Sequence, residues 1–527
     1  MFLLIFLILG KVSLGKVSGR SPETFPNPET FPSSPYSGEK NSPLRGEFFS
    51  IENIQNASEF AINHNVIHLK KIANFDIFQG SLKMRGVFQD FKRKQFKRYF
   101  RNGITDPLFS SQWHLSTVGF TSYTGKGVYI AIVDDGVQWQ HPDLQSNYIA
   151  GLSYDYNGRD NDPSPTRDDG HGTSCAGVAA AARNYVCGRG VAYEASIVGI
   201  RLIAEPTYDF QEAEGLSHKR DKIRIYSSSW GPNDDGMDMV APGPVTNAVL
   251  KQGFESGRNI YVWAGGNGRH NGDSSNYDGY ANSLYTFAIG AVDYNGNQAY
   301  YSESGANLLA VTPSSGVQNH GIITTDLMGF NGYSPGECTN SFGGTSSSAP
   351  LAAGIIALML EARPDLTNRD IQYIIANNAT KIGNSFHSNE FGFGLLKVGP
   401  LIEACKTWQK VKSGKRVGYV PAGDVSHSPV GSGVGNGASG PVSHIEQVLV
   451  TITMSHSKRG DIEISLISPK TTSVLATRHN DRHSGTFTWT FKSLRHWGES
   501  YKPGDNWTVT ASPGTVHSVK IEFYGVV

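Results

Sequence analysis

Cysteine is scarce in this chain of 527 residues, which holds only four. Four cysteines cannot build the disulfide framework of a small secreted domain, and they allow one or two bridges. The net charge is zero, so bulk electrostatics indicates no nucleic-acid partner. Long apolar runs are also missing. The run at residues 2–9 is too short to cross a bilayer, and no later stretch is expected to do so, which predicts a chain without a transmembrane anchor.

The length indicates two or more domains, and the N-terminus indicates export. Residues 1–15 read as a secretory signal peptide with cleavage after Gly15, although no Lys or Arg precedes the apolar run. A buried helix start is the alternative. The sequons at Asn56, Asn378 and Asn506 would be usable in a secretory compartment. We therefore expect a protein of the secretory pathway (Golgi lumen) or a secreted one.

Composition changes along the chain mark further boundaries. Residues 16–45 are rich in Pro and Ser, which predicts a disordered linker. Residues 46–98 look like a small mixed α/β unit, with helical spacing of apolar residues over 57–73. Residues 91–101 hold six bases and no acid, whereas acids outnumber bases between 134 and 171. The chain thus carries an acidic surface and a basic segment that could occupy it.

The remaining chain divides into two regions with different sequence patterns. From about 105 to 405, short runs such as "GVYIAIVDDG", "SIVGIRLI", "IYSSSW", "IYVWAGGN" and "FAIGAV" alternate with helix candidates such as "GTSCAGVAAAA" and "GPVTNAVLKQGFESG". This alternation predicts an α/β fold with a parallel sheet and helices on both faces. After 409, "IEQVLVTITM", "DIEISLIS", "TFTWTFKSL" and "VHSVKIEFYG" have period two, which predicts an all-β sandwich or barrel-like domain.

Several polar residues follow the predicted strands, where sites form in parallel sheets. They are Asp134 and Asp135 after one strand and Asn267 after another. His171 opens a helix, and a serine of "GGTSSSAPLAAG" (343–354) opens a second one. A serine nucleophile needs an imidazole base, a carboxylate that orients the imidazole, and donors for the oxyanion. The chain order Asp, His, Ser is known for this triad.

The motifs "IAIVDDGVQWQHPDL", "DDGHGTSCAG", "YSSSWGPNDDG", "VWAGGNG" and "GGTSSSAPLAAGIIALMLEA" resemble the subtilases and, within them, the kexin/furin proprotein convertases. "KRGDIEISLISP" resembles the P domain of that family. The resemblance implies a subtilisin-like catalytic domain at 99–408, a small α+β prodomain at 46–98, and a jelly-roll-like P domain at 409–527. It also implies the roles of Asp134 as orienting carboxylate, His171 as base, Ser346 as nucleophile and Asn267 as oxyanion donor.

The same resemblance implies how substrates are chosen. Asp135 and Asp168 would meet a basic P2 side chain, Asp234 and Asp278 would line the P1 arginine pocket, and Glu212 with Tyr280 would form the P4 site. For Asp168 and Glu212, a solvated surface role is the alternative. The expected activity is cleavage of proproteins after Lys-Arg or Arg-Arg. Ser347 and Ser348 are interpreted as packing groups, and Pro350 is expected at an early helical position, where its missing N–H costs least.

Calcium and a disulfide also follow from the resemblance. Three oxygen-rich sets suit Ca²⁺. They are Asp155, Asp160 and Asp162; Asp106, Asp143 and Asn184; and Asp234, Asp273 and Glu303. Cys187 and Cys338 match a family disulfide, while Ser275 and Ser304 stand where a second bridge would be. Cys175 is interpreted as a small buried residue, with a redox role as the alternative.

The basic segment matches a self-cleavage site after Lys97-Arg98, with Lys92-Arg93 as the alternative. The prodomain would then inhibit its own protease, and a monomer is expected. Two other functions stay open from the sequence. One is a broad-specificity degradative subtilase, which the acidic pockets argue against. The other is a secreted binding protein that uses Arg459-Gly460-Asp461, a tripeptide more easily explained as part of the P domain.

Overall fold

The computed structural model describes residues 106–166, 169–318, 320–329, 331–412 and 441–527, together with the backbone of six strands outside these ranges. The chain forms two compact units, residues 1–101 and 102–527. The expected signal peptide, the linker, and the cleavage residues Lys97 and Arg98 lie outside the described residues. The expected limits of the domains therefore stay predictions.

The first unit contains a four-stranded antiparallel sheet. Its strands are β1 (Phe48–Glu52), β2 (Ile67–Ile72), β3 (Phe75–Gln79) and β4 (Phe88–Asp90), in the order β2-β3-β1-β4. The helix predicted over 57–73 is wrong for Ile67–Ile72, which pairs with β3. Apolar spacing over so short a segment does not separate helix from strand, and pairing with a neighbour decides the outcome.

The second unit is built on a seven-stranded parallel sheet in the order β11-β10-β9-β8-β5-β7-β6. The strands are β5 (Tyr129–Asp134), β6 (Tyr154–Asp155), β7 (Ser196–Arg201), β8 (Ile225–Ser228), β9 (Ile260–Ala264), β10 (Thr286–Val292) and β11 (Leu308–Pro313). This confirms the parallel sheet that was predicted from the alternation of strand-like and helix-like runs. A separate antiparallel pair joins β12 (Ile322–Thr325) to β13 (Cys338–Phe342).

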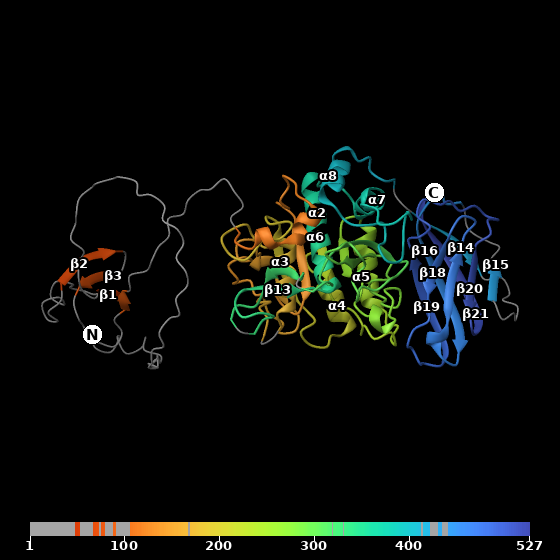
Figure 1. Cartoon of the computed structure of the whole chain (residues 1–527), viewed down its shortest axis with the longest axis horizontal. Helices are drawn as coiled ribbons and strands as arrows, with labels where there is room; N and C mark the ends of the chain where they lie inside the picture. The colour runs from red at the N-terminus through yellow and green to blue at the C-terminus, as the bar shows by residue number, and fades with distance from the viewer. Residues whose placement is uncertain are drawn as a thin grey trace. The chain divides into compact units, whose positions relative to one another are not determined.

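Helices cover this sheet (Figure 1). They are α2 (Trp113–Val118), α3 (His171–Ala180), α4 (Asp209–Ser217), α5 (Pro244–Glu255), α6 (Thr345–Ala362), α7 (Asn368–Asn378) and α8 (Val398–Thr407). Among the described residues, α6 alone is long and apolar enough to cross a membrane, contrary to the expectation from sequence. However, 83% of its apolar window is buried in the protein, as suits the central helix of a core.

Two antiparallel four-stranded sheets follow, as the period-two pattern predicts. One has the order β14-β21-β16-β19 and the other β15-β20-β17-β18. The strands are β14 (Lys415–Pro421), β15 (Gly431–Val434), β16 (His444–His456), β17 (Glu463–Ile467), β18 (Thr472–Ala476), β19 (Gly485–Ser493), β20 (Thr508–Ser512) and β21 (Thr515–Val526). Their inward side chains, such as Ile452, Leu466 and Phe523, form a second core, which also includes Tyr277 and Ala306 from the preceding domain.

Candidate active site

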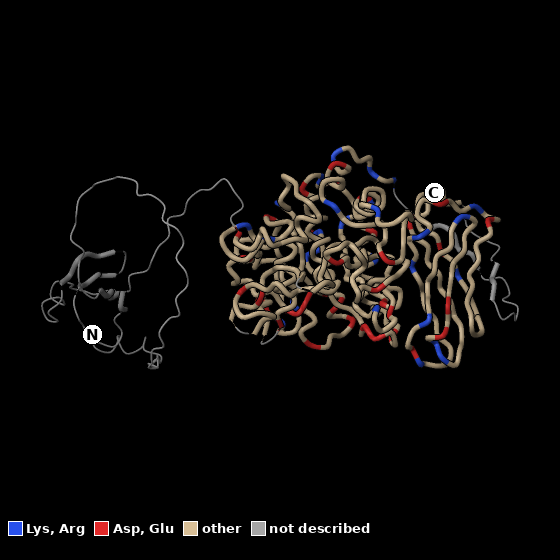
Figure 2. Tube along the Cα trace, in the orientation of Figure 1, with Lys and Arg blue, Asp and Glu red and all other residues tan. Residues whose placement is uncertain are grey.

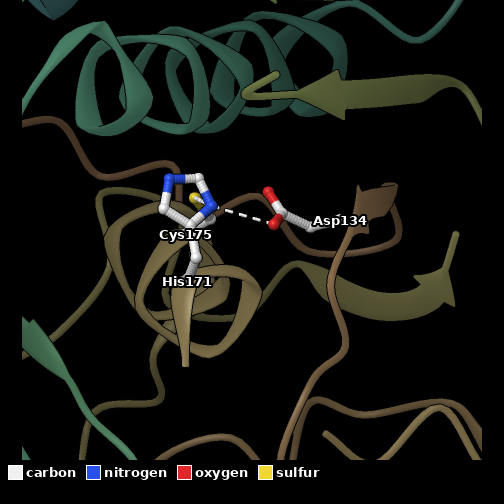
Figure 3. A group of neighbouring side chains, drawn as sticks. All are labelled: Asp134, His171 and Cys175. Carbon is white, nitrogen blue, oxygen red and sulfur yellow. Dashed lines mark hydrogen bonds and ion pairs between the residues drawn. The ribbon is translucent and has the colours of Figure 1, made fainter. Parts of the chain in front are cut away.

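The Asp134 carboxylate and the His171 imidazole meet at the carboxyl end of β5. Asp134 ends that strand and is buried, whereas His171 opens α3. His171 Nδ1 lies 2.8 Å from Asp134 Oδ1, the contact drawn in Figure 3. Burial works against a charge on the imidazole, but the neighbouring Asp134 carboxylate outweighs it and raises the pKa of His171 well above its usual value. Because Nδ1 is held by Asp134, Nε2 is the nitrogen left for proton transfer.

The three serines of "TSSSAP" differ sharply in exposure. Ser346 is partly exposed, while Ser347 and Ser348 are fully buried in the first turns of α6. The Ser347 hydroxyl lies 2.7 Å from the Ser314 hydroxyl and donates to the Gly344 carbonyl. The exposure agrees with the interpretation of Ser347 and Ser348 as packing groups. Of the three hydroxyls, that of Ser346 is therefore the one that a substrate can approach.

Pro350 lies farther into α6 than expected, at its sixth residue. A proline inside a helix has no N–H for the carbonyl four residues earlier, which here belongs to Ser346. Two side chains donate to that carbonyl instead, the Ser229 hydroxyl at 3.1 Å and the Cys175 thiol at 3.4 Å. Cys175 Sγ is also 3.9 Å from His171 Nδ1. The thiol thus links the helix of the base to the helix of the serine.

Asn267 lies at the N-terminus of α6. Its Oδ1 accepts the Thr345 backbone N–H at 2.7 Å, and its Nδ2 donates to Asp234 Oδ2 at 3.3 Å. Gly344 precedes the helix with a positive φ of 70°, which a glycine adopts without strain. A carboxamide nitrogen carries two hydrogens. One is directed at Asp234, so the other can serve an oxyanion near Ser346.

Two acids expected in the P1 pocket lie near each other. Asp234 accepts the Asn267 N–H, and Asp278 accepts the N–H groups of Tyr280 and Ala281. Burial, reinforced by the charges of Asp234 and Asp273, raises the pKa of Asp278 to about 7. A carboxylate that is costly to ionise alone is stabilised by a guanidinium beside it.

The acids expected at P2 and P4 have different surroundings. The Asp135 carboxylate accepts the backbone N–H groups of His171 and Gly172, so it caps α3. Burial and the nearby Asp134 raise the pKa of Asp135 to about 7. Asp168 lies outside the described residues. Glu212 and Tyr280 are brought together, with the Tyr280 hydroxyl donating to Glu212 Oε2 at 2.7 Å.

The set of Asp106, Asp143 and Asn184 has a donor arrangement that fits a cation. Asp106 Oδ1 accepts the Asn184 N–H, and Asp143 Oδ1 accepts the Asn184 amide. The second oxygens of both carboxylates are buried without a hydrogen-bond partner in the described part of the chain. Burial raises the pKa of Asp143 to about 8 and also raises that of Asp106. A hard cation would satisfy these oxygens.

The set of Asp234, Asp273 and Glu303 also fits a cation. Their ligand oxygens lie within 4.8 Å of one another. Burial, together with mutual repulsion, raises the pKa of Asp273 to about 6 and that of Glu303 well above its usual value. Three close carboxylates are stable in ionised form only with a positive charge among them.

The contacts of Asp155, Asp160 and Asp162 do not form a third such set. Asp155 Oδ2 pairs with Arg201 at 3.0 Å, and Asp155 Oδ1 accepts turn N–H groups. Asp162 Oδ1 is engaged by Trp139 and Ser164. Two of the three carboxylates therefore have partners without a cation. The buried Arg201 was not singled out from the sequence, because nothing in "GIRLI" shows that it also donates to the Asp135 carbonyl.

The two expected disulfide cysteines are joined, since Cys187 and Cys338 form a disulfide. Cys175 and Cys405 are buried free thiols. The Arg459-Gly460-Asp461 tripeptide forms a short turn in which Arg459 pairs with Asp481 and Asp461 pairs with Lys458 at 2.7 Å. These contacts support a structural role for the tripeptide.

Comparisons with known proteins agree with this geometry. The subtilase family matches residues 125–394, and the proprotein convertase P-domain matches residues 445–522. The chain is 38% identical to PC3-like endoprotease variant B of Hydra vulgaris (78% of this chain, 64% of the relative). It is also 38% identical to Furin-1 of Xenopus laevis (80% and 58%) and to Endoprotease bli of Onchocerca volvulus (80% and 67%). The chain thus spans less than two thirds of the length of the first two.

A solved serine protease of Aeromonas sobria has the same fold. Its TM-score is 0.71 at 21% identity, over 84% of this chain and 99% of that protein. At this identity the likeness shows the fold alone. The sequence comparisons show the family as well. Two family domains match in the same order, and the chain is 38% identical over 476 residues to a relative of which it covers two thirds. The chain belongs to the subtilase family and, within it, to the furin-like proprotein convertases.

Proposed function

We propose that the chain is a calcium-dependent serine endopeptidase that cleaves proproteins after paired basic residues, Lys-Arg or Arg-Arg. The observation that carries the proposal is the 2.8 Å contact of His171 with Asp134. The His171 helix is linked by Cys175 to the partly exposed Ser346. The furin and PC3-like relatives support the choice of substrate. The acidic side chains near the site also support this choice of substrate, because the Lys and Arg side chains of a substrate would stabilise their charged form.

The reaction follows from the roles of these groups. His171 Nε2 takes the Ser346 proton as the hydroxyl attacks the scissile carbonyl, and Asp134 stabilises the imidazolium that forms. The free hydrogen of Asn267 Nδ2 and the Ser346 N–H stabilise the oxyanion. His171 then returns its proton to the leaving amine. Water repeats the sequence to release the acyl group.

Substrate side chains are selected by charge. Asp234 and Asp278 bind the P1 guanidinium, Asp135 and Asp168 bind the P2 base, and Glu212 with Tyr280 forms the P4 site. Figure 2 shows several acidic segments (red) along the lower edge of the catalytic domain in that view. Ca²⁺ is held by Asp106, Asp143 and Asn184, and by Asp234, Asp273 and Glu303. When bound, the ion would neutralise these carboxylates and so stabilise the loops that carry them.

Maturation completes the proposal. The signal peptide at 1–15 directs the chain to the secretory pathway, the linker at 16–45 follows it, and the prodomain at 46–98 inhibits the protease until the chain cuts itself after Arg98. The catalytic domain at 99–408 and the P domain at 409–527 act together as a monomer, whether in the Golgi lumen or after secretion. The substrates are proproteins.

The test is hydrolysis of three matched fluorogenic peptides that end in Lys-Arg, Ala-Arg and Ala-Phe, each with and without a calcium chelator. Ser346→Ala is the inactive control. Cleavage that is confined mainly to Lys-Arg and is lost on chelation is expected. Equal cleavage of all three peptides would show a degradative subtilase. Absence of cleavage by protein that has lost its prodomain would leave only a binding function.

A further inference from the structure

A lysine of the P domain is buried against the catalytic domain. Lys492 belongs to β19 and has only 1% of its surface exposed. Its ammonium donates to three carbonyls, those of Ser283 at 2.7 Å, Thr286 at 3.1 Å and Ala281 at 3.2 Å. An ammonium has three hydrogens and no acceptor, so the three carbonyls satisfy it fully. Such complete pairing is what a buried cation requires.

The backbone of β19 joins the same stretch of the catalytic domain. The Lys492 N–H donates to Asn282 Oδ1 at 2.8 Å, and the Lys492 carbonyl accepts the Asn276 amide at 2.9 Å. Asn282 Nδ2 in turn donates to the Thr490 carbonyl at 2.6 Å. Residues 276–286 are therefore held by β19 through both main-chain and side-chain contacts.

That stretch carries two of the proposed substrate-binding residues, Asp278 and Tyr280. Ala281 connects them to the lysine, since its N–H donates to Asp278 and its carbonyl accepts from Lys492. Burial lowers the pKa of Lys492 to about 7, and the charge of Asp278 works against this by favouring the ammonium form. A single residue, Ala281, thus connects the ammonium to the pocket acid.

We propose that Lys492 is a positioning residue for substrate selection, which fixes the 276–286 segment so that Asp278 and Tyr280 receive the P1 and P4 side chains of a basic peptide. The inference rests on the proposed function. A purely structural contact between the two domains would not act on substrate binding in particular. The role proposed for Lys492 instead predicts an effect on substrate affinity and none on the chemical step. Asp134, His171 and Ser346 make no contact with Lys492 among the described residues.

The test compares the full-length chain with Lys492→Met, which keeps the length of the side chain and removes its donors. We expect KM for the Lys-Arg peptide to rise about tenfold with kcat within twofold, because the triad is untouched. Inactivation of Ser346 by a small sulfonyl fluoride should keep its rate. The exposed Lys502 provides the control, and Lys502→Met should leave KM unchanged.

Two results would overturn the inference. One is an unchanged KM in Lys492→Met. The other is an equal fall in kcat and in sulfonyl fluoride reactivity, which would show a general structural role. Lys492→Gln, which retains two donor hydrogens, should give an intermediate KM and carries the test if Lys492→Met does not fold. Failure of the unsubstituted chain to cleave Lys-Arg would reject the proposed function instead. In that case hydrogen exchange of residues 276–286 tests the positioning, and an unchanged rate in the variant rejects it.

Discussion

At the scale of single residues, the activity of Ser346 depends on the hydrogen bonds of its backbone carbonyl as well as on its hydroxyl. Pro350 deprives the Ser346 carbonyl of its partner within α6. Ser229, the residue that follows β8, and Cys175 of α3 replace that partner. Their donors hold the first turns of α6 against α3, which carries His171, and against the residue that follows β8. The buried thiol of Cys175 thus has a hydrogen-bonding role, and burial raises its pKa to about 11, which argues against a reactive thiolate.

Removing the Ser229 hydroxyl should therefore impair catalysis. In Ser229→Ala the Ser346 carbonyl keeps only the weak thiol donor, so we expect kcat/KM to fall about tenfold, equivalent to about 1.4 kcal/mol. The measurement is steady-state hydrolysis of the Lys-Arg peptide. Ser227 of β8, two residues earlier, supplies a matched control, because its buried hydroxyl has no partner in the described structure. An equal loss in Ser227→Ala would contradict this role of Ser229.

At the scale of elements, α2 carries a histidine that opposes folding in acid. His114 is fully buried, and neither ring nitrogen has a hydrogen-bond partner among the residues described. Burial lowers the pKa of His114 to about 3, from 6.5 in the unfolded chain. The unfolded state therefore binds the proton more readily, and stability falls as the pH drops below 6.5.

The expected loss from His114 alone is about 2 kcal/mol between pH 7 and pH 5. His114→Leu should remove this part of the pH dependence, as measured by denaturant unfolding at both pH values. His270 is exposed, so His270→Leu should leave the pH dependence as it was. If the free energy of unfolding of His114→Leu falls between pH 7 and pH 5 by as much as that of the unsubstituted chain, His114 does not cause the loss.

The elements also show what a sequence can predict. Strands such as β5 and β9 were predicted because they are continuous apolar runs between turn residues, and β16 and β21 because they alternate. Ile67–Ile72 was not predicted as a strand, since its apolar spacing also fits a helix and only its hairpin pairing with β3 decides between the two. In the site, motifs placed Asp134, His171 and Ser346 on the right elements. The contacts of Ser229, Arg201 and Lys492 depend on the packing of distant segments, which no local pattern records.

At the scale of the whole molecule, the catalytic and P domains are joined by polar contacts as well as by apolar ones. Besides Lys492, Arg369 of α7 donates to both carboxylate oxygens of Glu446 in β16, with Nε–Oε2 at 2.9 Å. The Tyr373 hydroxyl also donates to Glu446. The Glu446 side chain is only 1% exposed, so its charge depends on these partners.

Breaking this pair should destabilise the protein strongly. Arg369→Ala leaves a buried carboxylate with one neutral donor, and we expect a loss of about 3 kcal/mol in the free energy of unfolding. Denaturant unfolding followed by tryptophan fluorescence measures it. The exposed pair of Lys410 and Asp365 is the comparison, and Lys410→Ala should make no measurable difference. A loss no larger in Arg369→Ala than in Lys410→Ala would refute the role of the buried pair.

We propose that carboxylates near the triad turn a subtilase into a protease for basic sites. The most direct measurement is the ratio of kcat/KM for the Lys-Arg and Lys-Phe peptides in the unsubstituted chain and in Asp278→Asn. We expect the substitution to lower this ratio about 100-fold, equivalent to about 3 kcal/mol for an unpaired guanidinium, with hydrolysis of the Lys-Phe peptide unchanged. A ratio that is the same in both proteins would contradict the claim.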